Sequence, residues 1–341
     1  MKLFFVGPQS FLGRVTGGQR RFLEAQRCCC VGSEQIVSGF WGATKLILVR
    51  NATYVAFDER YLFICVLLLL TRKRFIFFPR GNKLVHFKYS YGKLRLWIYK
   101  KIFGWLYSKC ALLVFQTKAQ AEEFQEMYFY KGSYEVLYNN INVSWIEQMG
   151  SLSDLKKCSD SPAINNKVSC SPRERGWSVG FMGGVDRRKG FDVAYEALLE
   201  LVSAGLVQFH VAGVEASVVK KYDVVPHGFV SGKDVAIFYR CCDFIVIPSE
   251  YDSFPNVLLE ALACGSIPLI TRDRITEEIL GRESILLFDR DSVSIRNKIL
   301  LLINNPGELQ SARVECANLL ARYTFDWCAR IREIVGMETK L

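Results

Sequence analysis

The stretch Asp243–Ile270, DFIVIPSEYDSFPNVLLEALACGSIPLI, predicts a strand, a loop, a helix and a second strand in succession. Phe244–Ile247 is a short apolar run typical of a buried parallel strand. Asn256–Cys264 has the apolar spacing of a helix that Gly265 ends, and Ile267–Ile270 starts the next strand. In such a βαβ unit the loop lies at the carboxyl end of the first strand, where open α/β sheets bind ligands.

Two carboxylates and the start of a helix suggest that this loop binds a ligand. Asp252 precedes the predicted helix and Glu260 lies eight positions later, so we expect both to line one cleft. The backbone N–H groups of Ser253, Phe254 and Asn256 should gather at the helix start, which favours an anion. A phosphate between two acids suits a nucleotide sugar, because one acid can bind ribose hydroxyls and the other sugar hydroxyls. An ordinary βαβ unit with two solvated acids is the alternative.

The same stretch resembles the signature of the retaining GT-B glycosyltransferases of family 4, normally P-S-x-x-E-G-F-P-x-x-x-x-E-A. Glu260 keeps the second Glu, whereas Asp252 replaces the first and Ser253 replaces the Gly after it. The resemblance implies an α/β protein with two Rossmann-like domains facing a cleft. It also implies that Asp252 orients the transferred sugar and that Glu260 holds the ribose. The donor contacts implied by this motif are Ser253, Phe254, Pro255 and Asn256.

A glycine-rich basic loop, GGVDRRKG, follows the predicted strand Ser178–Met182. Backbone N–H groups and cations together can neutralise a diphosphate while it departs. The loop resembles the family pattern G-R-x-x-x-x-K-G, with Lys189 on the family's Lys and Gly184 in place of its Arg. An ordinary basic turn is the alternative. The predicted donor contacts of this loop are Gly183, Gly184, Arg187, Arg188 and Lys189.

The start of the chain predicts a second phosphate contact. Lys2–Gly7 is typical of a buried strand, and Gln19–Arg27 has helical spacing after Gly17 and Gly18. The glycine spacing does not fit the dinucleotide fingerprint G-x-G-x-x-G, so a nicotinamide site is not expected. The resemblance implies that the glycine pair lets the backbone approach the donor phosphate, and a flexible turn is the alternative.

Three further residues are assigned through the resemblance. The Pro-Arg-Gly turn after the predicted strand Phe75–Phe78 faces the acceptor in some family members, so Arg80 is expected to hold an acceptor phosphate there. His86 follows in the same region, although a lone histidine is more often a surface or core residue. The turn that begins at His227 often borders the nucleobase in this family, which assigns Phe229 to the donor.

The segment Thr71–Lys109 contains eleven Lys or Arg, eleven aromatic residues and no acid. On a helical wheel over Lys93–Tyr107, one side groups apolar residues and the other is basic with an aromatic residue. This composition is typical of a segment on anionic lipid, and single-stranded nucleic acid and a solvated basic helix are the alternatives. The apolar side is Leu94, Ile98, Ile102 and Trp105, and the basic side is Lys93, Trp97, Lys100 and Lys101.

Length, charge and cysteines bound the remaining possibilities. A chain of 341 residues fits two domains. Residues 1–170 hold 24 Lys and Arg against 11 Asp and Glu, a net of +13, whereas residues 171–341 hold 20 against 23, a net of −3. Twelve cysteines without regular spacing predict no disulfide framework or zinc site, which favours a reducing cytoplasm. No signal peptide is expected, and the apolar run Tyr61–Leu70, a predicted helix, is too short to span a bilayer.

We therefore expect an acceptor-binding, membrane-facing domain at 1–165, a donor domain at 175–322, and a helix at 323–341 that returns to the first domain. The resemblance implies a metal-independent transferase with no cofactor, and the triplet Asp289-Arg290-Asp291 is interpreted as a solvated turn rather than a metal site. The expected donor is a nucleotide sugar and the acceptor a lipid-linked or oligosaccharide chain. We expect a peripheral protein of the cytoplasmic membrane face in bacterial surface-polysaccharide assembly, without nucleic acid. An epimerase of the same fold and a non-catalytic partner subunit are the alternatives.

Overall fold

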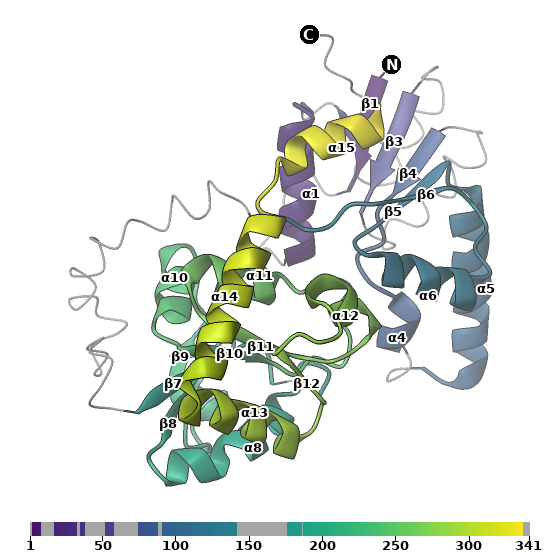
Figure 1. Ribbon diagram of the computed structural model, residues 1–341. Helices are drawn as coiled ribbons and strands as arrows, with labels where there is room; N and C mark the ends of the chain where they lie inside the picture. The colour runs from purple at the N-terminus through teal and green to yellow at the C-terminus, as the bar shows by residue number, and fades with distance from the viewer. Residues whose placement is uncertain are drawn as a thin grey trace. The chain divides into compact units, whose positions relative to one another are not determined.

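The computed structural model describes residues 2–7, 17–32, 35–37, 52–57, 74–87, 91–141, 176–185 and 187–336. The chain forms two compact units, Met1–Asn139 with Asp326–Leu341, and Asn140–Phe325. Each unit is built on one six-stranded sheet in which every described pair of strands is parallel (Figure 1). The α/β class with two Rossmann-like sheets, predicted from the sequence, is confirmed.

The sheet of the first unit has the strand order β2-β1-β3-β4-β5-β6. All five residues of β3 are buried, and β3 pairs with β1 over its whole length. The sequence analysis missed this strand because Thr53 and Tyr54 interrupt its apolar run, although Thr53 is fully buried. The predicted helix Tyr61–Leu70 lies outside the described residues. The strands are β1 Lys2–Val6, β2 Ile36–Val37, β3 Ala52–Ala56, β4 Arg74–Phe77, β5 Leu112–Phe115 and β6 Tyr134–Val136.

Helices of the first unit come from both ends of the chain. They are α1 Gly17–Cys28, α4 Lys83–Phe87, α5 Lys93–Lys109, α6 Lys118–Tyr128 and α15 Trp327–Val335. The last of them packs on the first, where the Arg21 guanidinium lies 5.5 Å from the centre of the Trp327 ring. Cys28 and Cys328 form a disulfide here, across a sequence separation of 300 residues. This pair is a correction to the cysteine prediction, and it removes the cysteine argument for a reducing compartment.

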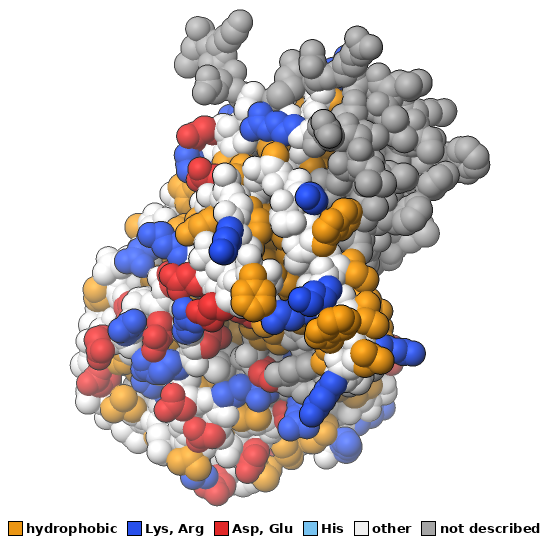
Figure 2. Space-filling model, turned by 90° about the vertical axis from the view of Figure 1, so that its right-hand side faces the viewer, with side chains coloured by type: hydrophobic (Ala, Val, Ile, Leu, Met, Phe, Trp, Pro, Cys, Tyr) orange, Lys and Arg blue, Asp and Glu red, His pale blue; other side chains and the backbone are white. Residues whose placement is uncertain are grey.

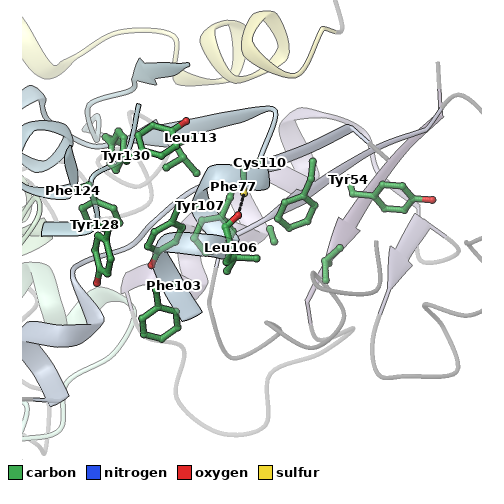
Figure 3. Packing of buried hydrophobic residues seen from close by; sticks show 14 of the residues in the cluster. Tyr54, Phe77, Phe103, Leu106, Tyr107, Cys110, Leu113, Phe124, Tyr128 and Tyr130 are labelled. Carbon is green, nitrogen blue, oxygen red and sulfur yellow. Dashed lines mark hydrogen bonds between the residues drawn. The ribbon is translucent and has the colours of Figure 1, made fainter. Parts of the chain in front are cut away.

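Stacked aromatic rings fill the core of the first unit (Figure 3). The Tyr107 ring of α5 lies 5.2 Å from Phe124 and 5.1 Å from Tyr128, both on α6, and 5.8 Å from Phe77 of β4. Fully burying a large apolar side chain contributes about 1.5–3 kcal/mol, so these rings join the helices to the sheet. Thr117 caps α6, because its hydroxyl accepts a hydrogen bond of 3.1 Å from the Gln120 N–H.

Helix α5 packs differently from the helical-wheel prediction. It buries a third side, formed by Phe103, Leu106 and Tyr107. The apolar side and the basic side that the wheel separated are both solvent-exposed, except that Lys100 is less exposed than the other seven residues. The wheel could not distinguish the buried side because apolar residues occur almost all around this helix.

The sheet of the second unit has the strand order β12-β11-β10-β7-β8-β9. The chain runs outward from β7 to β9 and then returns to place β10 on the other side of β7. Strand order therefore reverses between β7 and β10, and such a switch point is where open parallel sheets bind ligands. The strands are β7 Trp177–Met182, β8 Val207–Ala212, β9 Val225–Gly228, β10 Phe244–Ile247, β11 Ile267–Thr271 and β12 Leu287–Phe288.

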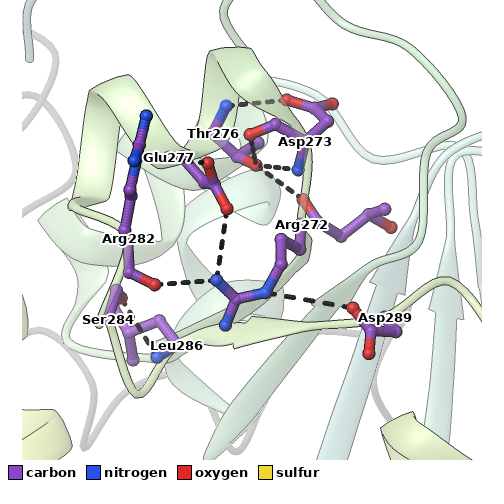
Figure 4. Close-up of polar contacts among 9 residues, drawn as sticks. Arg272, Asp273, Thr276, Glu277, Arg282, Ser284, Leu286 and Asp289 are labelled. Carbon is purple, nitrogen blue, oxygen red and sulfur yellow. Dashed lines mark hydrogen bonds and ion pairs between the residues drawn. The ribbon is translucent and has the colours of Figure 1, made fainter.

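Helices cover the second sheet and end at well-formed caps. The helix after β11 starts with a capping box, in which the Asp273 carboxylate accepts from the Thr276 N–H at 2.7 Å and the Thr276 hydroxyl accepts from the Asp273 N–H at 2.8 Å (Figure 4). Burial raises the pKa of Asp273, and the nearby charge of Asp252 adds to this effect. The helices are α8 Phe191–Ser203, α9 Ala216–Val219, α10 Lys233–Arg240, α11 Asn256–Cys264, α12 Arg274–Leu280, α13 Ser292–Asn304 and α14 Pro306–Tyr323.

In the part of the chain that the structure describes, no helix combines the length and the apolar character that crossing a membrane requires.

Replacing Phe124 by Ala should lower the free energy of unfolding by about 3–5 kcal/mol, because it leaves a cavity among Phe115, Tyr107 and Tyr128. Phe129 is the matched control, since it ends α6 but is 72% exposed. Its replacement by Ala should cost less than about 1 kcal/mol. Urea denaturation followed by circular dichroism measures both, and equal losses would contradict this description of the core.

Candidate functional site

Two loops from neighbouring strands meet at the switch point of the second sheet. One follows β7 and contains the glycine-rich basic sequence, and the other follows β10 and contains Asp252. The Glu250 N–H donates a hydrogen bond of 2.8 Å to the Arg188 carbonyl, which joins the two loops through their backbones. A small pocket opens between them, and among the residues lining it are Met182, Lys189, Pro248, Asp252, Pro255 and Val257.

Gly190 makes this close approach possible. Its φ of +73° lies in the left-handed region, and a Cβ atom there would lie 2.3 Å from the Pro248 carbonyl oxygen. No real Cβ approaches an oxygen so closely, so only glycine fits without moving one of the loops. The glycine that ends the basic loop therefore sets how tightly that loop packs on β10.

Lys189 and Asp252, predicted to be catalytic, face each other across the pocket. The Lys189 Nζ lies 3.4 Å from Asp252 Oδ2, and the two side chains are 39% and 31% exposed. A partly exposed pair of this kind contributes little stability, so its two members remain available to a ligand. The structure thus brings together the cation and the acid that the sequence placed 63 residues apart.

The start of α11 differs from its prediction in two respects. The Phe254 N–H donates to Asp252 Oδ1 at 3.3 Å, so one of the three amides expected to bind an anion already has a protein acceptor. The Phe254 side chain is 2% exposed, and its ring packs 5.4 Å from that of Tyr323 on α14. The side chain therefore anchors the loop, and the predicted donor contact of Phe254 remains a prediction for its backbone. Ser253 is buried as well.

Glu260, the second predicted acid, lies on α11 and does not line the pocket itself. It follows the pocket residue Val257 by three positions, a spacing that places both on one face of the helix. The Tyr239 hydroxyl on α10 donates a hydrogen bond of 2.8 Å to Glu260 Oε2. Tyr239 is fully buried, so this bond holds the carboxylate in one orientation. Sequence reasoning missed Tyr239, which no motif marks.

The triplet Asp289-Arg290-Asp291 is not a solvated turn throughout. Asp291 caps α13 by accepting from the Ser294 N–H at 2.7 Å, and Asp289 lies 3.9 Å from the Arg272 guanidinium (Figure 4). Arg290 donates to the Pro248 carbonyl at 2.9 Å and to the Arg187 carbonyl at 2.7 Å. It therefore fastens both loops of the site. Within the described ranges, no group of three or more His, Cys, Asp and Glu side chains has the arrangement of a metal site.

Gly213, which follows β8, lies against both the end of β9 and the glycine-rich loop. The Gly213 N–H donates to the Gly228 carbonyl at 2.8 Å, and a Cβ at Gly213 would lie only 3.0 Å from the nitrogen of Gly183. Phe229 follows Gly228 and is 47% exposed. Gly184 and the Arg187 and Arg188 side chains, also predicted to contact the donor, lie on the loop itself and are at least partly exposed.

The predicted contacts of the first unit lie on three of its segments. Gly17 and Gly18 form the first residues of α1 rather than a turn before it. The Arg80 guanidinium lies 5.8 Å from the centre of the Phe57 ring, beyond the carboxyl end of β4. His86 belongs to α4, and its side chain lies outside the described part of the structure.

A histidine pair, of which His210 is buried and His227 partly buried, joins β8 and β9. His210 Nδ1 and His227 Nε2 are 2.9 Å apart, and the His227 ring also packs 5.2 Å from Phe238. Burial lowers the pKa of His210 to about 4, and the neighbouring His227 contributes to this shift. Burial also lowers the pKa of His227. Both rings are therefore neutral at pH 7, which lets one donate and the other accept.

We expect Gly190→Ala to destabilise the second unit much more than Gly205→Ala. Both glycines have positive φ, +73° and +69°, but a Cβ at Gly205 would meet nothing within 4 Å. Gly205→Ala should therefore cost only the conformational strain of about 1–2 kcal/mol, whereas Gly190→Ala adds the collision with Pro248. Urea unfolding of the two variants gives the comparison. Similar costs would show that the two loops are not held this closely.

The histidine pair predicts a loss of stability in acid. The unfolded chain binds protons at His210 with a pKa near 6.5 and the folded chain only near 4, so the unfolded state binds more protons between these values. The free energy of unfolding should therefore fall as the pH drops from 6.5 to 4, by on the order of 3 kcal/mol, with no contribution above this window. His210→Asn should flatten that part of the pH profile of urea midpoints. An unchanged slope would contradict the assignment.

Part of the sequence is similar to known proteins. Residues 177–305 match the family model described as glycosyl transferases group 1. A Klebsiella pneumoniae protein, described as an uncharacterized 41.2 kDa protein in the cps region, is 24% identical over 147 residues, 42% of this chain and 37% of that protein. An uncharacterized glycosyltransferase of Methanocaldococcus jannaschii is 30% identical over 135 residues, 37% of this chain and 38% of that protein. The matches span less than half the length of these relatives.

Comparison with solved structures identifies the fold. Anabaena HepE, solved in complex with UDP and glucose, is similar over all of both chains with a TM-score of 0.71 and 14% identity. The sucrose-phosphate synthase of Thermosynechococcus elongatus has a TM-score of 0.66 and 15% identity over 84% of this chain and 72% of that one. At these identities the likeness concerns the fold alone. The chain thus has the GT-B fold predicted from its motifs, and residues 177–305 are similar to the glycosyl transferases group 1 family.

Proposed function

We propose that this chain is a retaining, metal-independent glycosyltransferase of family 4 that uses a nucleotide-sugar donor. The observation that carries the proposal is the pocket at the switch point between β7 and β10, where Lys189 and Asp252 lie 3.4 Å apart beside a glycine-rich loop. A diphosphate needs backbone amides and cations, and a sugar needs a fixed carboxylate. The pocket has both kinds of group on two loops that are bonded to each other.

In this reaction Lys189 binds the diphosphate and stabilises the charge that develops as it leaves. The amide of Gly184 shares this role at the carboxyl end of β7, whereas the Gly183 N–H already donates to the Ala212 carbonyl at 2.9 Å. Because the Lys189–Asp252 pair is partly exposed, the lysine can turn toward a phosphate at little cost, which leaves Asp252 to accept hydroxyl groups of the transferred sugar. Glu260, oriented by Tyr239, accepts the ribose hydroxyls.

A second cation is needed where the family's arginine is replaced by Gly184. Arg290 is an unsuitable candidate, because its guanidinium donates to the carbonyls of Pro248 and Arg187. Arg187 and Arg188 are better placed, since they precede Lys189 on the same loop and the Arg187 side chain is exposed. Together with Lys189 they supply the positive charge that a divalent metal provides in other transferases.

The descriptions of two similar proteins support a donor class and a cellular process. The structure of HepE contains UDP and glucose, which supports a nucleoside-diphosphate hexose as the donor here. The Klebsiella relative is described by its place in a cps region, which supports a role in assembling a bacterial surface polysaccharide such as capsule, O-antigen or lipopolysaccharide. We infer a lipid-linked or oligosaccharide acceptor bound by the first unit, and a location at the cytoplasmic membrane face.

Release of nucleoside diphosphate from UDP-, GDP- and dTDP-sugars, with and without lipid-linked saccharides, tests the proposal. Lys189→Ala should lower kcat/KM about 10²–10³-fold, because a charge stabiliser of the leaving group is lost. Lys220→Ala is the matched control, since Lys220 is exposed elsewhere in the same unit and should leave the rate unchanged.

Two results would contradict the transferase, and a third would contradict the role of Lys189. An altered sugar without an acceptor identifies an epimerase of the same fold. Donor binding without turnover for any acceptor identifies a non-catalytic subunit, which the replacements at Asp252, Ser253 and Gly184 make the second candidate. Full activity of Lys189→Ala would remove the lysine from the mechanism.

A further inference from the structure

Helix α5 presents large apolar side chains to solvent along one face. Leu94 is 71% exposed, Trp97 58% and Trp105 43%, and Ile98 and Ile102 are also exposed. They follow one another at helical spacing, so they form one continuous strip rather than scattered sites. Figure 2 shows hydrophobic side chains interspersed with Lys and Arg on the face of the molecule that includes this part of the first unit. Contiguous exposed apolar surface marks an interaction site.

The fold does not require this apolar strip. Helix α5 is held by its opposite side, where Phe103, Leu106 and Tyr107 are buried against the sheet and α6. At Gly104 the helix approaches α6 so closely that a Cβ would lie 3.3 Å from the Tyr128 carbonyl oxygen. Polar side chains on the outer face would leave these contacts unchanged. The outer face is therefore available for a partner.

The charges around the strip indicate an anionic partner. Lys93, Arg95, Lys101 and Lys109 are exposed on the same helix, within the segment Thr71–Lys109 that has no acid. The Lys101 ammonium lies 5.9 Å from the centre of the Trp97 ring, so cation and aromatic share one patch. Phe129, 72% exposed at the end of α6, extends the patch and lies 5.2 Å from the Lys100 ammonium.

The chemistry of the strip favours lipid over the other anions. Nucleic acid binds aromatic faces by stacking, but Leu94, Ile98 and Ile102 offer no face on which a base could stack. A second copy of this chain would bring another basic α5 against the first, which like charges oppose. An anionic bilayer satisfies both features, because its headgroups attract Lys and Arg and its acyl boundary accepts aliphatic side chains and tryptophan.

We propose that α5 lies flat in the interface of an anionic bilayer. Leu94, Trp97, Ile98 and Trp105 enter the acyl boundary, while Lys93, Arg95 and Lys101 contact the phosphate headgroups. This is an interaction of the first unit alone, and it stands whether or not the chain transfers a sugar. If it does, the contact holds the first unit at the surface where a lipid-linked acceptor lies.

Co-sedimentation of the full chain with vesicles tests this surface, using phosphatidylcholine alone and phosphatidylcholine with 30% phosphatidylglycerol. We expect binding to the anionic vesicles at least tenfold stronger than to the neutral ones, weakening as salt increases. The double variants Leu94→Ser with Ile98→Ser, and Lys93→Glu with Lys101→Glu, should each reduce the partition coefficient at least tenfold. Fluorescence of Trp97 and Trp105 should shift to the blue in wild type on binding, and brominated lipid should quench it.

Matched controls separate the surface from general effects of charge and polarity. Lys220→Glu with Lys221→Glu makes the same charge change in the second unit, and Leu301→Ser with Val314→Ser removes exposed apolar groups from α13 and α14. Both should bind vesicles like wild type. Unaltered binding by the α5 variants, equal losses in the controls, or absence of wild-type binding would overturn the proposal. The proposal would also be overturned if sedimentation showed that the chain self-associates, and if the α5 variants lost this self-association but still bound vesicles.

Donor turnover measured without vesicles keeps this test distinct from that of the proposed function. The α5 variants should release nucleoside diphosphate from a donor with a soluble acceptor at the wild-type rate. Vesicle binding without any turnover would count against the transferase and leave the lipid surface standing.

Discussion

The contact between the loop after β7 and the loop after β10 is the constraint on which the whole site depends. Gly190 lets the first loop pack on the Pro248 carbonyl, and the Glu250 N–H to Arg188 carbonyl bond joins their backbones. Arg290 adds two bonds, one to a carbonyl of each loop. Only because the loops are held in this way do Lys189 and Asp252, from different βα connections, reach one pocket. The contact lies where the strand order of the parallel sheet reverses, and a glycine of the basic loop allows the close approach.

Much of this arrangement could be predicted from the sequence, because the second unit has strong local signals. Short apolar runs bounded by glycine and proline predicted its strands, and the apolar spacing of Asn256–Cys264 predicted the helix that carries Glu260. Lys189 and Asp252 were both predicted to contact the donor, and in the structure their side chains lie 3.4 Å apart. The fold could be predicted because each motif is typical of a loop between a strand and a helix, and the successive motifs are all consistent with one parallel sheet.

The rest depends on long-range contacts that local patterns do not record. The buried side of α5 could not be identified, because apolar residues surround that helix and only packing on α6 decides which are covered. The Cys28–Cys328 disulfide joins residues 300 positions apart. Tyr239 and Arg290 act on the site through hydrogen bonds from other elements. The motif marks the position of Phe254 but does not record that its side chain is buried. In each case the sequence does not show which residues, far apart in the chain, are in contact in the folded protein.

A structure of the chain with UDP bound measures the central claim most directly. The two loops, held together by Gly190 and Arg290, predict the diphosphate at the carboxyl ends of β7 and β10, with a phosphate oxygen within hydrogen-bond distance of the Lys189 ammonium and the ribose hydroxyls on Glu260. A diphosphate bound elsewhere, with Lys189 still paired to Asp252, would contradict it.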